Sequence, residues 1–287
     1  MTELMLEIVP PSRMTSDNYK EKVMDKVSES VNSIKPDVIN VPEIVDENFE
    51  GKPYYRNVSA RRFAKKINEL TGKKVIVNKV VVHCNGLNEL QKWINKSVNE
   101  LGLKDFVFVG GSSDKFSYPG PSVTEANNLA KSFSSINAGN IMIPSRENEA
   151  QRMLTKTLSG ASFFTSQILF ESEKTQKTLF EYNSLCIEKK IKPAKVYLSF
   201  CPVSGINELF FLRWLGVEMP EKTEKEIFSE EEKIPVNSIN SAEKVWNKII
   251  TFSEKENLSI PLNLNIEEIF LHNLDSCIEL ALRLRQA

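Results

Sequence analysis

The sequence has few of the residues that build metal centres and disulfide frameworks. Its 287 residues include only two histidines and four cysteines. No two of these cysteines form a C-x-x-C pair, which argues against a zinc ribbon or a disulfide-stapled fold. We expect no metal centre, and we expect four reduced and mostly buried thiols at Cys84, Cys186, Cys201 and Cys277.

An excess of positive charge and a long apolar run are absent as well. The chain has 37 Lys and Arg against 38 Asp and Glu, which disfavours binding to nucleic acid or to an anionic membrane surface. No stretch approaches the roughly 18 to 20 consecutive apolar residues that cross a bilayer. The opening MTELMLEIVPPSR carries Glu7 and two prolines in place of a signal-peptide cleavage site. We therefore expect a cytoplasmic protein without nucleic-acid or membrane partners.

Short β-rich runs alternate with longer segments of helical period along the whole chain. This alternation is typical of a parallel sheet with crossover helices, and the length suits one α/β barrel. The sequence therefore predicts a single-domain TIM (β/α)₈ barrel over residues 1–287. The expected strands are 4–9, 37–41, 77–83, 105–109, 140–143, 163–170, 195–200 and, least clearly, 261–265.

Eight helices are expected between and after these strands, at 18–33, 60–71, 88–101, 123–134, 147–158, 173–190, 205–216 and 271–285. Gly72, Gly102 and Gly216 stand at three helix ends, where a left-handed residue commonly closes a helix. A further charged, mainly helical excursion is expected at about 223–253. The main rival is an open doubly wound sheet, but prolines follow the first strand in place of its G-x-G-x-x-G fingerprint.

In such a barrel, the active site lies at the carboxyl ends of the strands. Glu7, in the first strand, is the first candidate. A carboxylate that leaves water gains a raised pKa and becomes a plausible general acid. The alternative is a barrel-filling glutamate that is paired with Lys or Arg, and the sequence leaves both readings open.

Two further candidate groups follow the third and fourth strands. His83 and Cys84 could be metal ligands or a nucleophile with its base, but adjacent strand residues face opposite sides, so His83 is better read as orienting a substrate. Gly110, Gly111, Ser112 and Asp114 form a small-residue loop whose backbone N–H groups could cradle an anion, although a plain turn is equally open. Tyr118 beyond it could stack on a planar ring or only cover the barrel mouth.

The fifth and sixth strands end in two more candidates. Ser145 could cap a helix, with Arg146 gripping a phosphate or carboxylate there, or only an acidic neighbour. Gln167 carries an amide into a mouth where a buried polar group needs partners, either a heterocycle with amide-like edges or nearby backbone. A barrel hydrolase or lyase with Glu43, Asp46 and Glu47 as a carboxylate set is a further reading.

Several of these motifs resemble the methylenetetrahydrofolate reductase family, in one register along the chain. The run E-I-V-P-P from Glu7 is similar to the family's E-x-x-P-P. Residues 159–171 resemble its G-A-x-x-x-x-T-Q-F-F-F-D, residues 202–204 its L-P-V-S, and residues 215–220 its apolar-G/N-V-x-I-P. The resemblance implies a TIM barrel that reduces 5,10-methylenetetrahydrofolate, or a related pterin, to the 5-methyl form.

The resemblance also implies cofactors and roles for particular residues. FAD would lie over the barrel mouth and NADH or NADPH would reduce it. Glu7 would be the acid that assists opening of the methylene bridge. Substrate binding falls to Gln167, Ser112, Asp114 and Tyr118. Cofactor binding falls to His83, Cys84, Gly110, Gly111, Ser145, Arg146 and Lys156.

The chain departs from the family where the flavin is contacted. Val41-Pro42-Glu43 stands in place of V-T-Y-G, and Gly110-Gly111-Ser112 in place of R-G-D. Two explanations remain: a divergent reductase, with hydride passing directly from the nicotinamide as one variant, or a pterin-binding or methyl-transfer partner subunit that has lost the flavin. A homo-oligomer or a partner subunit is compatible with either.

Overall fold

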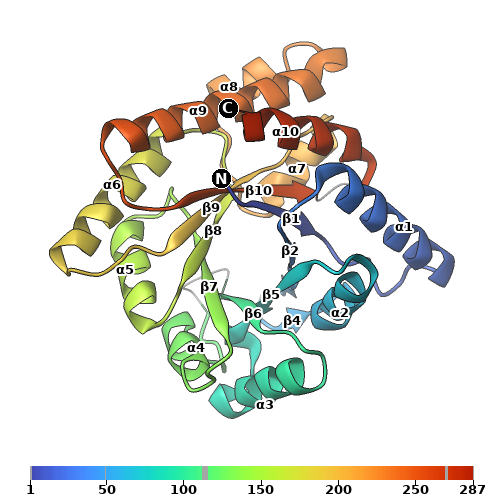
Figure 1. Cartoon of the computed structure of the whole chain (residues 1–287). Coiled ribbons are helices and arrows are strands. Elements are labelled where there is room, and N and C mark those ends of the chain that lie inside the picture. The colour runs from blue at the N-terminus through green and yellow to red at the C-terminus, as the bar shows by residue number, and fades with distance from the viewer. Residues whose placement is uncertain (1, 49, 112–115, 269–270, 287) are drawn as a thin grey trace.

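Eight parallel strands close into a barrel, which confirms the predicted TIM fold (Figure 1). The computed structural model describes residues 2–48, 50–111, 116–268 and 271–286. Every barrel strand pairs with its neighbours in parallel, and the last strand pairs with the first. Around the barrel the strands are β1 (Leu4–Ile8), β2 (Val38–Val41), β5 (Lys74–Val80), β6 (Asp105–Val109), β7 (Asn137–Met142), β8 (Phe163–Ile168), β9 (Lys195–Phe200) and β10 (Leu262–Glu268).

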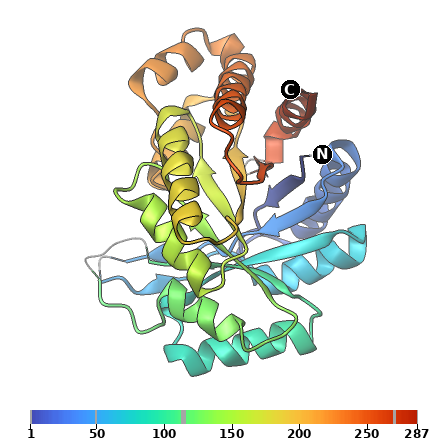
Figure 2. The ribbon, with the colours of Figure 1, turned by 60° about the vertical axis from the view of Figure 1, so that its left-hand side comes forward.

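Helices surround the barrel, as the two ribbon views show (Figures 1 and 2). They are α1 (Asp17–Ile34), α2 (Ala60–Thr71), α3 (Gly86–Asn99), α4 (Val123–Ala130), α5 (Glu149–Ser159), α6 (Glu173–Glu188), α7 (Ile206–Trp214), α8 (Glu221–Ile227), α9 (Ile234–Lys255) and α10 (Leu274–Gln286). In the described ranges, no helix has the length and apolar character needed to cross a membrane. The expected excursion corresponds to α8, the short 3₁₀ helix η2 (Glu231–Lys233) and α9.

Three short elements complete the described chain. The small antiparallel pair β3 (Asp46–Glu47) and β4 (Pro53–Tyr54) lies between β2 and α2. The 3₁₀ helix η1 (Val81–His83) follows β5, and η3 (Leu271–Asn273) precedes α10. These elements follow the carboxyl ends of β2, β5 and β10, where the loops of a TIM barrel build its site.

Some predicted boundaries were wrong in ways that matter for the site. The third predicted strand was placed at 77–83, but β5 ends at Val80, and His83 belongs to a 3₁₀ turn. The last predicted strand was ended at 265, but β10 continues to Glu268. A helix was expected from 147 with Ser145 as its cap, whereas α5 begins at Glu149 after Asn148 in the left-handed conformation. Local pattern did not fix these ends because tertiary pairing decides where a strand stops.

The barrel interior is filled by an apolar layer with one residue on each of six strands. Phe163 stands beside Gly139 on the neighbouring strand, and a Cβ on that glycine would lie 2.3 Å from the Phe163 ring. Glycine at this position therefore makes room for the ring. The layer consists of Met5, Val38, Ile76, Val107, Phe163 and Tyr197. We call these six residues the barrel floor, because on five of the six strands the next inward-facing position toward the carboxyl end is polar.

Candidate functional site

A polar layer lies directly above the barrel floor. Successive side chains on a strand alternate between faces, so the residue two places beyond each floor residue also points inward. At five of the six positions the side chain is polar, the exception being Val109 on β6, and β10 adds two polar side chains; all but Glu7 are almost completely buried. The polar layer consists of Glu7, Asn40, Asn78, Thr165, Ser199, Asn265 and Glu267.

Glu7 and Glu267 are direct neighbours in this layer, since they are register partners on β1 and β10. The Asn40 side-chain amide donates to Glu7 Oε2 at 2.5 Å. Burial raises the pKa of the Glu7 carboxyl to about 7, although the Asn40 hydrogen bond opposes the shift. Burial, and next the nearby Glu7 charge, raise the pKa of Glu267 well above its ordinary value. The pair is therefore suited to hold a proton near neutral pH.

The polar layer has more acceptors than protein donors can satisfy. Among the described residues, four of its side-chain oxygens are buried without a hydrogen-bond partner: Asn40 Oδ1, Asn78 Oδ1, Thr165 Oγ1 and Asn265 Oδ1. Buried acceptors are normally paired, and an unpaired group in a native structure calls for a specific explanation. A ligand rich in N–H donors is one such explanation.

Glu47, His83 and Tyr118 form a second polar group at the same end of the barrel. His83 Nε2 lies 2.8 Å from Glu47 Oε1, and the Tyr118 hydroxyl donates to Glu47 Oε2 at 3.0 Å. The His83 and Tyr118 rings meet edge to face, with centroids 5.4 Å apart. The two residues predicted to bind cofactor and substrate thus share one carboxylate. Cys84 next to them is buried, and burial raises its thiol pKa, so it is not an activated nucleophile.

Gly111 fixes the position of Tyr118. A Cβ on Gly111 would lie 2.3 Å from the Tyr118 ring. We expect Gly111→Ala to displace the ring and lower the free energy of unfolding by about 1–3 kcal/mol, as overpacking does. Urea unfolding would measure the change. Gly110→Ala, where a Cβ would make only an ordinary contact with Val123 at 3.6 Å, serves as the comparison for a glycine that is not in close contact, and equal losses in both would contradict the packing argument.

A cavity of about 690 Å³ lies beside this group, between the ends of β6 and β7 and the first turns of α4 and α5. It is lined by five of the predicted residues, namely Gly110, Gly111, Tyr118, Arg146 and Lys156. Lys156 Nζ donates to the Ile141 carbonyl at 2.8 Å and lies 3.3 Å from Glu149 Oε1. Burial lowers the pKa of Lys156.

Arg146 and a further lining residue, Arg152, give the cavity its charge. In the part of the chain that the structure describes, neither guanidinium has an ion pair or a side-chain hydrogen bond, and both lie close enough to Lys156 to lower its pKa. Unpaired guanidinium groups beside a glycine turn are suited to an anion.

The remaining predicted residues are separated from this cavity. Gln167, at the end of β8, donates from Nε2 to the Gly216 carbonyl at 3.0 Å, so neighbouring backbone is its partner. Ser145 lines a depression of about 30 Å³ that also includes Gln167. Ser112 and Asp114, which the sequence predicts to bind substrate, lie outside the residues that the structure describes. The predicted residues therefore divide into the inward Glu7, the cationic cavity and the Gln167 rim.

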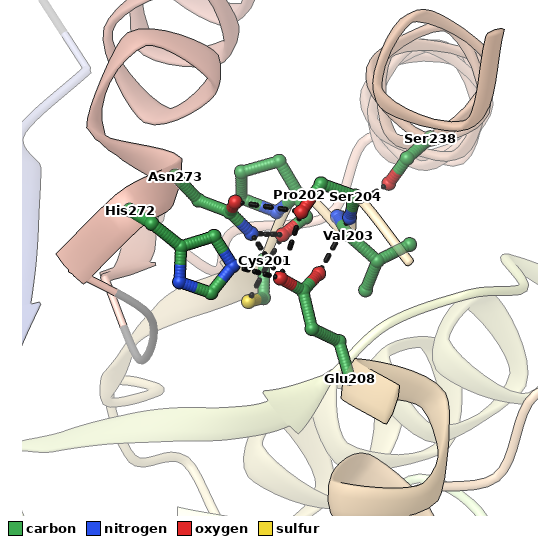
Figure 3. Close-up of polar contacts among 8 residues, drawn as sticks. All are labelled: Cys201, Pro202, Val203, Ser204, Glu208, Ser238, His272 and Asn273. Atoms are coloured by element: carbon green, nitrogen blue, oxygen red, sulfur yellow. Dashed lines mark hydrogen bonds and ion pairs between the residues drawn. The ribbon is translucent and has the colours of Figure 1, made fainter. Parts of the chain in front are cut away.

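A buried network fixes the loop after β9, where the P-V-S run lies (Figure 3). The Glu208 carboxylate on α7 accepts from the Ser204 backbone and hydroxyl, from Asn273 Nδ2 at 3.0 Å and lies 2.6 Å from His272 Nε2. Asn273 also donates to the Pro202 carbonyl. Glu208 is only 5% exposed, so it joins the β9 loop to the segment that follows β10.

Replacing Glu208 with glutamine should weaken this network without changing its volume. An amide oxygen accepts less strongly than a carboxylate, and the amide N–H₂ would face donors. We expect Glu208→Gln to lower the free energy of unfolding by about 1–2 kcal/mol. Thermal unfolding would measure it, and Glu224→Gln, on the exterior pair with Arg213, is the matched control. An equal effect of both substitutions would show that the network adds no stability.

Several residues of the polar layer were missed in the sequence. Asn40, Asn78 and Asn265 each interrupt an apolar strand, and the run L-N-L-N-I-E-E places Asn263, Asn265 and Glu267 at alternating positions. This alternation of polar and apolar residues was the signal in the sequence that could have identified an inward-facing polar face on the last strand. Glu267 was missed because the predicted strand ended at 265, three residues before the end of β10.

No family model matches the sequence, and no curated protein sequence matches it. Solved structures do match. A thermostable aldo-keto reductase in complex with the inhibitor epalrestat has a TM-score of 0.56 at 9% identity, covering 96% of this chain and 88% of that one. An Aquifex aeolicus VF5 protein has a TM-score of 0.52 at 10% identity, covering 99% and 92%.

A third structure is more similar. It is an uncharacterized protein from Clostridium thermocellum that binds two copies of 5-methyl-5,6,7,8-tetrahydrofolic acid, with a TM-score of 0.81. The match covers 98% of this chain and 94% of that chain at 16% sequence identity. At this identity the likeness establishes a shared fold alone: the chain is a TIM barrel.

Proposed function

We propose that this protein binds a reduced folate, with the pterin ring over the polar layer at the carboxyl ends of the strands. The observation that carries the proposal is the surplus of acceptors in that layer. Two neighbouring carboxyl groups and four unpartnered oxygens belong to this one layer. A ligand that binds there must bring hydrogen-bond donors.

A pterin offers donors in a suitable arrangement. Its N3–H and its 2-amino group lie side by side, so one carboxylate can accept both, in the two-point manner that makes such contacts strong and specific. The folate bound by the structurally similar Clostridium thermocellum protein supports the same ligand class. Glu7 is partly exposed and held by Asn40, so it is the carboxylate that we assign to this edge.

Calorimetric titration with 5-methyltetrahydrofolate tests the proposal. We expect saturable binding to the wild-type protein. A useful comparison is Glu3→Gln, because Glu3 directly precedes β1 at the opposite end of the barrel, where it accepts from Lys195 and Tyr197. This variant should bind like the wild type. No binding by the wild-type protein, with the fold intact by circular dichroism, would overturn the proposal.

A second candidate is the reductase reading, which the cationic cavity favours. Its volume lies within the range of small-molecule sites, and the Arg146 and Arg152 guanidinium groups with the Gly110-Gly111 backbone fit the anionic part of a dinucleotide. Bound there, FAD or NAD(P)H would supply the hydride for reducing a methylene folate. In this chain, the two arginines would anchor the cofactor and Glu7 would handle the proton at the pterin.

An absorbance spectrum tests the second candidate. Protein purified with flavin and then desalted should retain a flavin band that bleaches with reduced nicotinamide. Arg146→Ala with Arg152→Ala should lose the band, whereas Arg62→Ala, in the groove between α1 and α2, should retain it. A colourless protein that oxidises NADH or NADPH only with 5,10-methylenetetrahydrofolate would indicate direct hydride transfer. A colourless and inert protein would exclude the reductase function and leave folate binding as the remaining proposal.

A further inference from the structure

The polar layer contains a second carboxyl group that the sequence did not single out. Glu267 is 9% exposed and its Cα is the register partner of Glu7. Both residues face inward, because Met5 and Glu7 share one face of β1, and Asn265 and Glu267 share one face of β10. Two carboxyl groups on neighbouring strands thus meet at the mouth, without an intervening residue.

No cation compensates this pair. Among the described residues, neither Glu7 nor Glu267 has an ion pair. The inward side chains that face the pair from β2, β5, β8, β9 and β10 are Asn40, Asn78, Thr165, Ser199 and Asn265, none of which titrates near neutral pH. The nearest titratable group after β5, His83, lies against Glu47, and Lys79 on the outer face pairs with Glu43. Like charges so close cannot both ionise easily.

The hydrogen bonds make the two carboxyl groups unequal. Asn40 donates to Glu7 Oε2 at 2.5 Å, which favours the ionised form of Glu7. Asn265 Nδ2 reaches Glu267 Oε1 only at 3.4 Å, and it is shared with the Ser199 hydroxyl at 2.9 Å. A hydrogen bond from Ser199 lowers the pKa of Glu267, but burial and the neighbouring Glu7 charge raise it by more. Glu7 should therefore ionise first and Glu267 should keep the proton, a division by environment that separates acid from carboxylate.

We propose that Glu7 and Glu267 act as one acid pair, in which Glu7 is the carboxylate that accepts the donor edge of the pterin and Glu267 stays protonated beside it. This inference rests on the proposed folate binding and assigns Glu267 a role in it. Folate affinity should fall on both sides of neutral pH. On the acid side Glu7 takes up a proton and loses acceptor strength; on the alkaline side Glu267 ionises and places a second negative charge at the site.

Glutamine substitutions distinguish the two roles, because glutamine has the shape of a protonated glutamate and no charge. In titrations with 5-methyltetrahydrofolate between pH 5.5 and 9, Glu7→Gln should bind about 10- to 100-fold more weakly at pH 7.5, the loss expected for a hydrogen bond to a charged group. Glu267→Gln should stay within about threefold of the wild type there, since an uncharged donor remains. It should also lose the alkaline decline.

Glu268→Gln is the matched control. Glu268 is the next residue on β10 and equally buried, but it faces α1, where the Ser30 hydroxyl donates to it. This variant should keep the wild-type pH profile of binding, including both declines. Protonation of the ligand itself affects the wild type and the three variants equally, so it cancels when their pH profiles of binding are compared.

The outcomes separate this inference from the folate proposal. Equal losses for Glu7→Gln and Glu267→Gln at pH 7.5, or an alkaline decline that persists in Glu267→Gln, would overturn the acid pair while leaving folate binding intact. Carbon-13 NMR of glutamate carboxyl groups in the ligand-free protein gives a second readout. A buried protonated carboxyl that persists above pH 7 and disappears in Glu267→Gln would support the pair even if the wild-type protein bound no folate.

Discussion

Replacing Glu7 with glutamine is expected, under the proposed reductase function, to slow reduction of 5,10-methylenetetrahydrofolate by NADH or NADPH by about 10²- to 10⁴-fold, the usual contribution of a positioned acid or base. Burial raises the pKa of Glu7 to about 7, so both protonation states are populated near neutral pH, where proton transfer is most efficient. The amide keeps the shape and can still contact Asn40, so the melting temperature should change little. Stopped-flow absorbance of the nicotinamide measures the rate.

The comparison for this rate is again Glu3→Gln, at the opposite end of the barrel. It should retain the wild-type rate, because Glu3 lies below the barrel floor, where it accepts from Lys195 and from the hydroxyl of the floor residue Tyr197. A Glu7 variant with an unchanged rate would remove Glu7 from the chemistry. A large loss of stability in that variant, with no specific loss of rate, would make Glu7 a structural residue.

The second large effect concerns Glu268 and the pH dependence of stability. Burial raises the pKa of Glu268 from its ordinary value of 4.5 to about 7. The folded protein therefore keeps this proton at pH values where the unfolded chain has lost it. Stability from this group is fully present below pH 4.5 and is lost as the pH rises toward 7, at about 1.4 kcal/mol per pH unit and about 3 kcal/mol in total.

Glu268→Gln should reduce the slope in this part of the pH profile by the contribution of one carboxyl group, because glutamine is neutral at every pH and can still accept from Ser30. The contributions of Glu7 and Glu267, whose pKa values are also raised, should remain. Urea unfolding at half-unit steps from pH 4 to pH 8 would measure the slope. The exposed Glu21→Gln controls for removing one carboxyl group from the surface and should keep the wild-type slope. A slope that is unchanged in Glu268→Gln would mean that Glu268 is solvated and ionised in the folded protein.

The barrel itself could be predicted from the sequence because it depends on short-range pattern. Alternating strand and helix periods determined the order of the elements, and Glu7 was identified because a carboxylate inside an apolar run is conspicuous. Glu267 was not, since β10 was taken to end at Asn265 and the I-E-E run was assigned to the loop. Where a parallel strand ends depends on its neighbours β9 and β1, which are distant in sequence.

The grouping of site residues was also beyond local pattern. His83 and Cys84 were judged as strand neighbours on opposite faces, but β5 ends before them and His83 lies in a turn that brings it to Glu47. Ser145 was expected to cap a helix that actually begins after Asn148. In both cases the decisive contact joins segments that only the closed barrel brings together.

The barrel floor has a consequence for how this protein could change over evolution. Its six side chains, among them Met5, Phe163 and Tyr197, seal the barrel beneath the polar layer. Fold stability and ligand recognition are thus assigned to different levels of the same strands. Substitutions at the upper level, such as Asn78 or Thr165, can alter which molecule is accepted while the lower level continues to specify the barrel. The same scaffold is therefore open to new ligands through a handful of changes at one level.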